Sequence, residues 1–254
     1  MIEINYIPGL NTFNDRHIHI GVLRFSEMHS HLSQAFGERD IKLIPYYSAR
    51  NSLSQKIEDL YQQITDAGRA TLPLVGHSTG GIIARALAPR LKSKVLVTFG
   101  CPHGGNRLAD IAVEKFKDAS LKTKILRILK YDVSTKLNYF SDLTSQSLGQ
   151  FNLQYPIQRH GFYNIVCSQP HRELPLIFKM LSIYAQANSD HTDGIVSTEE
   201  QKCGQEIAAY QLDHLSQIGF FKHIVSPKRK KQAVTEFNKL LTTIEMLVKP
   251  VSTP

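Results

Sequence analysis

Hydrophobic residues in this chain gather in short runs that are separated by longer mixed segments. A short apolar run bounded by turn-forming residues is typical of a buried strand. The runs predict strands near residues 2–7, 41–46, 71–76, 94–99, 161–167 and 205–213. Helices are expected between them, because parallel strands need long crossover connections. The pattern therefore predicts an α/β fold, with a mostly parallel central sheet flanked by helices.

The clearest predicted helix follows Asn51. Its apolar residues recur at spacings of three and four and share one helical face. They are Leu53, Ile57, Leu60 and Ile64. Ser52 with Gln55 can form a capping box at its start, and Gly68 is a stop signal at its end. No repeat or linker separates the predicted elements, so residues 1–254 are expected to form a single domain.

Composition and charge narrow the classes of partner. The 254 residues are 42% hydrophobic, which is enough for one large core. A net charge of +8 favours peripheral contact with anionic membrane surfaces. The densest basic run, residues 228–231, could meet phospholipid headgroups or nucleic acid, or it could solvate the start of the final helix. No nucleic-acid-binding module is recognisable, so we expect no nucleic acid partner.

Targeting signals are not evident in the sequence. The first predicted strand begins almost at residue 1, with no secretory pattern before it. The longest apolar stretch, residues 174–187, is interrupted by Pro175 and Lys179 and does not predict a membrane span. We expect a cytoplasmic protein, or one exported by a route that leaves no N-terminal mark.

The segment Gly76-His77-Ser78-Thr79-Gly80 carries the first chemical signal. Its Gly-x-Ser-x-Gly spacing, between an apolar strand and a helix, is typical of a nucleophile elbow. A strained turn holds the serine clear of the fold, and glycines are needed beside it because a side chain there would clash with the neighbouring strand and helix. The alternative is a glycine-rich turn with an idle serine.

A serine nucleophile of this kind needs a base and an acid. In such folds they follow the serine in the order Asp or Glu, then His. Asp193 is the preferred acid, because Gly194 allows a turn that points the carboxylate toward an imidazole. His214 is the preferred base, since it follows the last predicted strand. The weaker candidates for the two roles are Asp190, His191 and His223.

The oxyanion of an acyl-transfer reaction needs two backbone N–H donors. The residue after the nucleophile, Thr79, should supply one. Leu10 should supply the other, from the loop of residues 8–12 after the first strand. An ordinary Pro-Gly turn at the end of that strand is the alternative.

Five segments in one order resemble bacterial triacylglycerol lipases of the α/β-hydrolase superfamily, the group typified by Pseudomonas and Burkholderia enzymes. The likeness extends over nearly the whole chain. The segments are Gly76-His77-Ser78-Thr79-Gly80-Gly81, Gly100-Cys101-Pro102-His103-Gly104-Gly105-Asn106, Phe151-Asn152-Leu153-Gln154-Tyr155-Pro156, Thr192-Asp193-Gly194-Ile195-Val196-Ser197 and Leu212-Asp213-His214-Leu215. The resemblance implies an α/β-hydrolase fold with Ser78, Asp193 and His214 as the catalytic triad.

The chain departs from that family at its metal and disulfide positions. The resemblance implies a calcium site after the histidine, but Ser216 and Phe220 stand at two of its positions, and neither offers the carboxylate that calcium prefers. We therefore expect no metal and no cofactor. Many members carry a disulfide near the acid loop. The three cysteines here have spacings that suggest neither a disulfide framework nor a metal site.

Two insertions are expected above the site. Residues 107–155 are similar in position to the lid of such lipases, so a helical lid is expected there, with a surface helix as the alternative. Its amphipathic stretch has apolar Leu121, Ile125, Ile128 and Leu129 beside basic Lys122, Lys124, Arg127 and Lys130. Residues 174–184 could line an acyl channel or pack against the core.

These residues favour a serine carboxylic-ester hydrolase of the lipase or esterase type, with a lipid or other acyl ester as substrate. A thioesterase, phospholipase or acyltransferase could use the same three residues, since they do not encode the leaving group. A catalytically silent hydrolase fold that serves as a binding protein is the remaining hypothesis.

Overall fold

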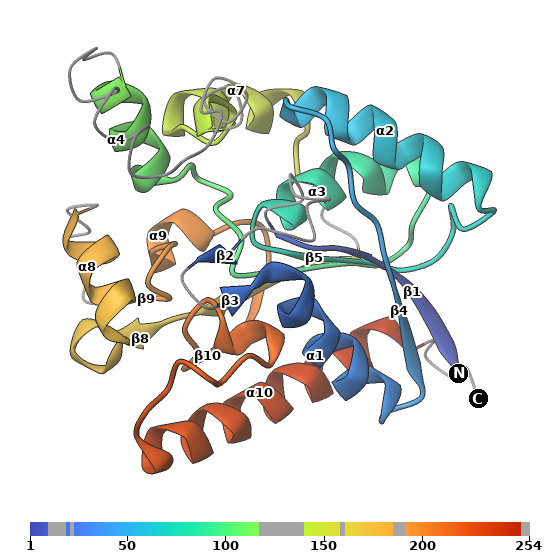
Figure 1. The fold of residues 1–254 in the computed structure, drawn as a ribbon. Helices are drawn as coiled ribbons and strands as arrows, with labels where there is room; N and C mark the ends of the chain where they lie inside the picture. The colour runs from blue at the N-terminus through green and yellow to red at the C-terminus, as the bar shows by residue number, and fades with distance from the viewer. Residues whose placement is uncertain (10–18, 21–22, 117–139, 158–160, 185–190, 250–254) are drawn as a thin grey trace.

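A parallel six-stranded sheet forms the centre of the molecule (Figure 1). The computed structural model describes residues 1–9, 19–20, 23–116, 140–157, 161–184 and 191–249. The strand order is β10-β7-β6-β5-β1-β4, and every neighbouring pair is parallel. These strands are β1 (Ile2–Ile7), β4 (Ile41–Pro45), β5 (Leu74–His77), β6 (Leu96–Phe99), β7 (Phe162–Cys167) and β10 (Glu206–Tyr210).

Helices cover both faces of this sheet, as predicted (Figure 1). On one face lie α2 (Leu53–Asp66) and α3 (Thr79–Leu91), and on the other lie α1 (Phe25–Gly37) and α10 (Pro227–Val248). Each pair buries its own apolar cluster against the strands. The sheet is therefore the middle of three layers, and its buried strands read as continuous apolar runs for that reason.

Shorter elements complete the described chain. The helices are α4 (Arg107–Phe116), α7 (Ser145–Gln154), α8 (Leu176–Tyr184) and α9 (Thr198–Gln201), with 3-10 turns η1 (His171–Glu173) and η2 (Ser216–Ile218). Two-residue strands pair as β2 (His19–Ile20) with β3 (Leu23–Arg24), and as β8 (Gln169–Pro170) with β9 (His191–Thr192). In the described part of the chain, no helix combines the length and the apolar character needed to cross a bilayer.

The predicted strands are all present, but three are at least two residues shorter than their predicted spans. The run at 71–76 becomes a strand only at Leu74, because Pro73 has no N–H to donate to a neighbouring strand. The strand predicted at 94–99 begins at Leu96. The strand predicted at 205–213 ends at Tyr210, where the Leu212 N–H turns back to the Tyr210 carbonyl at 3.0 Å.

Helix α2 matches its sequence pattern. Its four predicted apolar residues are buried, and the Ser52 hydroxyl accepts the Gln55 N–H at 3.3 Å. Gly68, predicted to stop the helix, lies just beyond its end with φ of +69°. The local pattern was sufficient here because capping and amphipathicity agree along one continuous segment.

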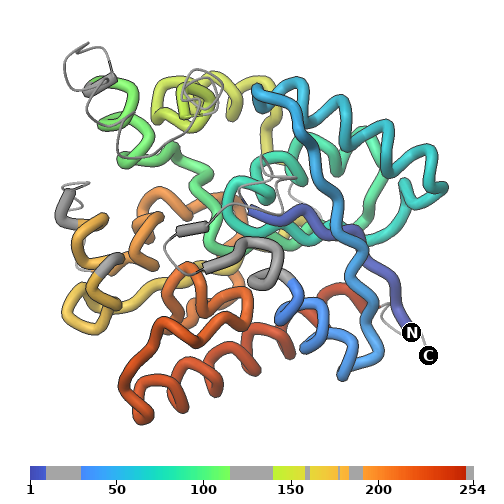
Figure 2. The backbone as a smooth tube through the Cα atoms, viewed as in Figure 1, coloured from blue at the N-terminus to red at the C-terminus, as the bar shows by residue number. Residues whose placement is uncertain are grey.

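The two predicted insertions have different outcomes. The apolar and basic residues of the expected lid lie at 121–130, outside the described residues, whereas α4 and α7 flank that stretch. In the second insertion, Leu174 and Phe178 are buried, and the Phe178 ring packs edge-on against His223 at 6.0 Å. Leu176 and Met180 are exposed. Figure 2 shows that α8 and α9 lie beyond the carboxyl ends of the strands, at the left of the view.

A buried polar network joins two of the segments that carry the family resemblance. Arg85 on α3 donates to Asn152 and lies 3.4 Å from Nδ1 of His103. Because Arg85 can only donate, Nδ1 accepts and the Nε2–H of His103 donates to Thr98 Oγ at 3.1 Å. Burial, with the Arg85 charge added, holds the pKa of His103 well below its usual value. A neutral His103 therefore pins residues 100–106 beside α3 and α7.

Candidate active site

Ser78 occupies the sharp turn between β5 and α3. Its backbone has φ of 55° and ψ of −133°, a combination that residues other than glycine rarely adopt. A Cβ on Gly80 would lie 2.1 Å from the Ile7 carbonyl oxygen, so the helix can approach β1 only with glycine there. Strain of this kind is found at functional sites, where it aims a side chain out of the fold.

Three predicted residues form one line of hydrogen bonds. His214 Nδ1 lies 2.7 Å from Asp193 Oδ2, and His214 Nε2 lies 3.0 Å from Ser78 Oγ. A carboxylate only accepts, so Nδ1 carries the proton and Nε2 keeps a lone pair for the Ser78 hydroxyl. All three residues are buried, with Asp193 fully so. The arrangement can remove a proton from a serine hydroxyl and hold the resulting imidazolium beside a negative charge.

The Asp193 carboxylate is held by four donors. Its Oδ1 accepts the backbone N–H groups of Ile195 at 2.9 Å and Val196 at 2.7 Å. Its Oδ2 accepts from His214 Nδ1 and from Gln217 Nε2, the latter at 2.9 Å. The turn that brings these two N–H groups round is the predicted Asp-Gly turn, in which Gly194 has φ of +97°. Gln217 was not predicted, and no motif or spacing in the sequence marks it.

The rival candidates lie elsewhere or have other partners. His223 Nε2 is 2.9 Å from Asp213 Oδ1, and this second, partly buried His–Asp pair shapes the loop that carries His214. The Asp213 carboxylate also accepts the N–H groups of Leu215 and Ser216. His191 is exposed on β9. Asp190 falls outside the described residues.

Of the two predicted oxyanion donors, the structure describes Thr79 but not Leu10. Thr79 is the first residue of α3, so its N–H belongs to the helical turn whose N–H groups point back toward the amino end. An anion is favoured at such a helix terminus. Leu10 lies outside the described residues.

The residues at the calcium positions of the resembling lipases make other contacts in this protein. The Ser216 hydroxyl donates to Asp213 Oδ2 at 2.7 Å, and the Phe220 ring stacks on His223 with centroids 5.9 Å apart. Over the residues that the structure describes, no cluster of three or more His, Cys, Asp or Glu side chains could hold a metal ion. The three cysteines are buried free thiols.

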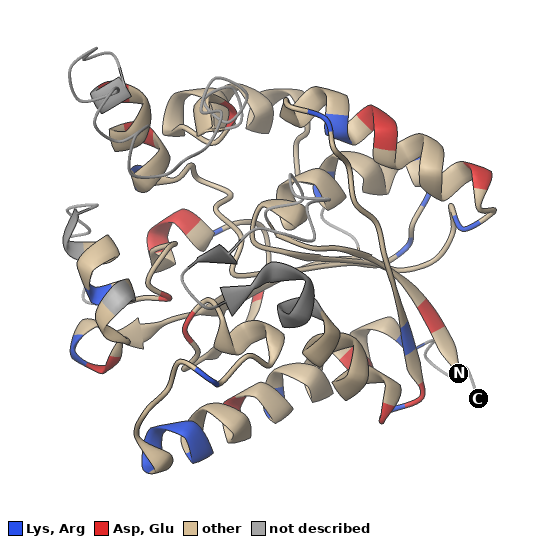
Figure 3. Ribbon diagram, in the orientation of Figure 1, with Lys and Arg blue, Asp and Glu red and all other residues tan. Residues whose placement is uncertain are grey.

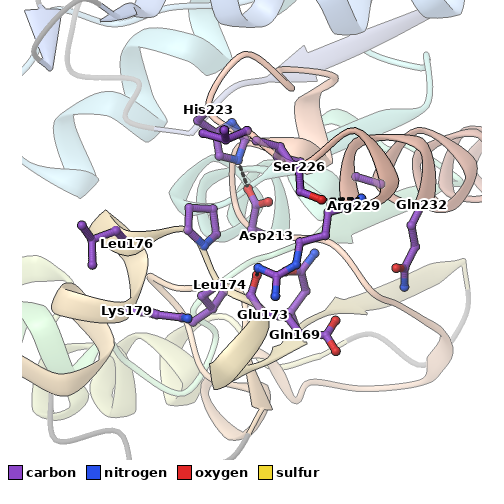
Figure 4. Close-up of a pocket in the computed structure, with 14 residues that line it drawn as sticks. Gln169, Glu173, Leu174, Leu176, Lys179, Asp213, His223, Ser226, Arg229 and Gln232 are labelled. Carbon is purple, nitrogen blue, oxygen red and sulfur yellow. Dashed lines mark hydrogen bonds and ion pairs between the residues drawn. The ribbon is translucent and has the colours of Figure 1, made fainter.

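A cavity of about 590 Å³ is lined in part by the Asp213–His223 pair (Figure 4). Its walls come from the η1–α8 segment and from the start of α10, and they include Leu174, Lys179 and Arg229. None of Ser78, Asp193 and His214 lines it. The basic run 228–231 is exposed in the first turn of α10, which Ser226 caps (Figure 3). That run therefore lies at the start of the final helix and is exposed to solvent, which is the second interpretation that the sequence offered for it.

Comparisons with known proteins identify the fold. No protein-family model matches the chain, and no curated protein matches it in sequence. Solved structures do match. The mature form of a Bacillus licheniformis lipase aligns with a TM-score of 0.61 at 13% identity, over 98% of this chain and 92% of that one.

Two further structures agree. A metagenomic carboxyl esterase aligns with a TM-score of 0.65 at 13% identity, over 96% of this chain and 76% of that one. The phospholipase PlaB from Legionella pneumophila aligns with a TM-score of 0.55 at 12% identity, over 98% of this chain and 63% of that one. At such identities the likeness concerns the fold. Together with the parallel sheet and its two helical layers, it identifies the chain as an α/β-hydrolase fold.

Proposed function

We propose that this protein is a serine hydrolase of carboxylic esters, with Ser78 as nucleophile, His214 as base and Asp193 as acid. The observation that carries the proposal is the line of hydrogen bonds from Asp193 Oδ2 through His214 to Ser78 Oγ, at 2.7 Å and 3.0 Å. A serine on a strained strand-to-helix turn, with its hydroxyl on the lone pair of an oriented imidazole, is suited to attack on an acyl carbon.

The reaction has two halves. His214 Nε2 takes the hydroxyl proton as Ser78 Oγ bonds to the ester carbonyl carbon, and the carbonyl oxygen becomes an oxyanion. The Thr79 N–H stabilises that oxyanion, with Leu10 as the sequence-based candidate for the second donor. The imidazolium then protonates the leaving alcohol, and an acyl-enzyme remains. In the second half a water molecule gives a proton to His214 as its oxygen bonds to the acyl carbon. His214 then returns that proton to Ser78 Oγ as the bond from Oγ to the acyl group breaks, which releases the carboxylic acid.

The substrate class is proposed as a lipid or another acyl ester. The three aligned structures named above carry the names lipase, carboxyl esterase and phospholipase, and each of these activities cleaves a carboxylic ester or a phospholipid ester. Phospholipid hydrolysis is the second candidate, because PlaB aligns over nearly the whole of this chain. Turnover of p-nitrophenyl esters, acyl-CoA and phospholipid vesicles by one preparation separates these possibilities.

Removal of the nucleophile tests the proposal. Ser78→Ala should abolish hydrolysis of p-nitrophenyl esters and labelling by a fluorophosphonate probe. Ser54→Ala, on the exposed side of α2, is the matched control and should behave as the wild type. Turnover by Ser78→Ala at the wild-type rate would refute the assignment. A wild-type protein that neither reacts with the probe nor hydrolyses any ester would favour a silent binding protein instead.

A further inference from the structure

Gln217 lies on η2, three residues after His214, and its side chain is fully buried. The side chain bridges two residues of the candidate site. Its Nε2 is 2.9 Å from Asp193 Oδ2, and its Oε1 is 3.2 Å from His77 Nε2. Asp193 Oδ2 is the same atom that binds His214 Nδ1, so Gln217 and His214 share one acceptor.

The partners determine which way the Gln217 amide points. Asp193 as a carboxylate only accepts hydrogen bonds, so the NH₂ group of Gln217 must face it. The amide oxygen then faces His77, and His77 must donate from Nε2. Donors therefore run in one direction, from His77 to Gln217 and from Gln217 to Asp193. His214 donates to the same carboxylate from the other side.

Packing holds this bridge in place. Gly100 has φ of +58°, and a Cβ there would lie 1.9 Å from Gln217 Oε1. The Gln217 N–H donates to the Asp213 carbonyl at 3.1 Å, which fixes η2 against the loop of His214. The His77 ring lies between Phe99 and His214, with ring centroids 4.9 Å and 4.7 Å away. Turning the amide away from Asp193 would break both side-chain hydrogen bonds of Gln217.

We propose that Gln217 is a positioning residue that holds the Asp193 carboxylate in the orientation His214 requires. The inference rests on the proposed function. With Gln217 removed, Oδ2 keeps only one of its two donors, and the carboxylate loses one of the four contacts that hold its orientation. The His214 ring would then be oriented less well toward Ser78. Gln217 has no contact with Ser78, so substrate binding should be unchanged.

The test is Gln217→Met, which keeps the side-chain length and removes both the donor and the acceptor. The value of kcat on a p-nitrophenyl ester should fall about 10- to 100-fold, the range expected for a lost hydrogen bond to a buried charge, with KM unchanged. Gln201→Met is the matched control. Gln201 is equally buried but bonds to backbone groups of Cys167 and Val196.

A double-mutant cycle with Asp193→Ala separates positioning from a general structural role. If Gln217 acts through the carboxylate, Gln217→Met should cost nothing beyond about twofold once Asp193 is alanine, whereas Gln201→Met should cost the same in both backgrounds. Residual activity and the rate of fluorophosphonate labelling are both measured, with thermal unfolding to confirm that each variant is folded.

Three results would overturn the inference. One is an equal cost of Gln217→Met in both backgrounds, and another is a loss confined to KM. The third is failure of both Gln217→Met and Gln217→Leu to fold while Gln201→Met folds, which would make Gln217 a structural core residue. The proposed function fails separately, if Ser78→Ala keeps its activity. An inactive Ser78→Ala together with any of the three results overturns the positioning role alone.

Discussion

Asp193→Asn gives the most demanding test of the hydrogen-bond pattern at the site. The carboxylate faces four donors, two on each oxygen. The N–H groups of Ile195 and Val196 belong to the backbone and cannot turn away. The oxygen of the introduced amide must therefore stay on their side, and its NH₂ group must face Nδ1 of His214.

The expected loss of kcat follows from this contact between two hydrogen-bond donors. The Nδ1–H of His214 and the NH₂ group of the asparagine would both be donors, so the His214 proton moves to Nε2. From Nε2 the ring donates to Ser78 Oγ and can no longer accept the hydroxyl proton. Each opposed or unmet buried hydrogen bond costs about 1–3 kcal/mol, and the Nδ1 and Gln217 contacts are both affected. The stabilisation of the imidazolium is lost as well. We expect kcat to fall about 10⁴-fold, the scale of a base held in the wrong tautomer.

The assay is kcat and KM for p-nitrophenyl ester hydrolysis by Asp193→Asn and Asp193→Ala. Alanine brings no opposing donor, so His214 keeps its tautomer, and the loss of kcat in Asp193→Ala should be no larger than in Asp193→Asn. If Asp193→Asn keeps activity within about tenfold of the wild type while Ser78→Ala is inactive, Asp193 is not the acid.

Two further predictions concern stability. Gly80→Ala would press a Cβ against the Ile7 carbonyl and should lower the free energy of unfolding by about 1–3 kcal/mol or more. Gly149→Ala on α7 places its Cβ in open space and should be neutral or stabilising. Urea unfolding of both variants measures the difference. Burial lowers the pKa of Lys56 to about 8, with Asp59 opposing the shift. The unfolded chain therefore binds more protons between pH 8 and 10.5, and the stability of the wild type should rise with pH by up to about 3 kcal/mol relative to Lys56→Met over that range. A pH-independent difference between those two proteins would show that Lys56 is not desolvated.

Much of the fold could be predicted because its signals are local. The face of α2, its cap at Ser52 and its stop at Gly68 lie within one short segment, and the apolar runs mark every strand of the central sheet. Strand ends were less predictable, because they depend on partners. Leu74 begins β5 only where Val95 offers its carbonyl. An apolar run shows burial, but it does not show where a neighbouring strand stops.

The residues of the candidate site were also only partly predictable from the sequence. The Gly-x-Ser-x-Gly turn and the order of acid and base selected Ser78, Asp193 and His214 from the sequence. The His214 side chain lies within hydrogen-bonding distance of the other two. Gln217 could not be found, since one glutamine among polar loop residues has no distinguishing spacing. Its contacts with Asp193 and His77 span 24 and 140 residues of chain.

The sequence by itself determined which segments become strands and helices, and where a strained serine turn stands among them, because side-chain periodicity and glycine placement act over a few residues. Only the tertiary structure decided which distant groups share a proton or an acceptor. The parallel sheet brings the carboxyl ends of β5, β7 and β10 to one edge, and the loops beyond them meet there. Hydrogen bonds depend on tenths of an ångström between those loops, and such distances are set by packing rather than by spacing along the chain.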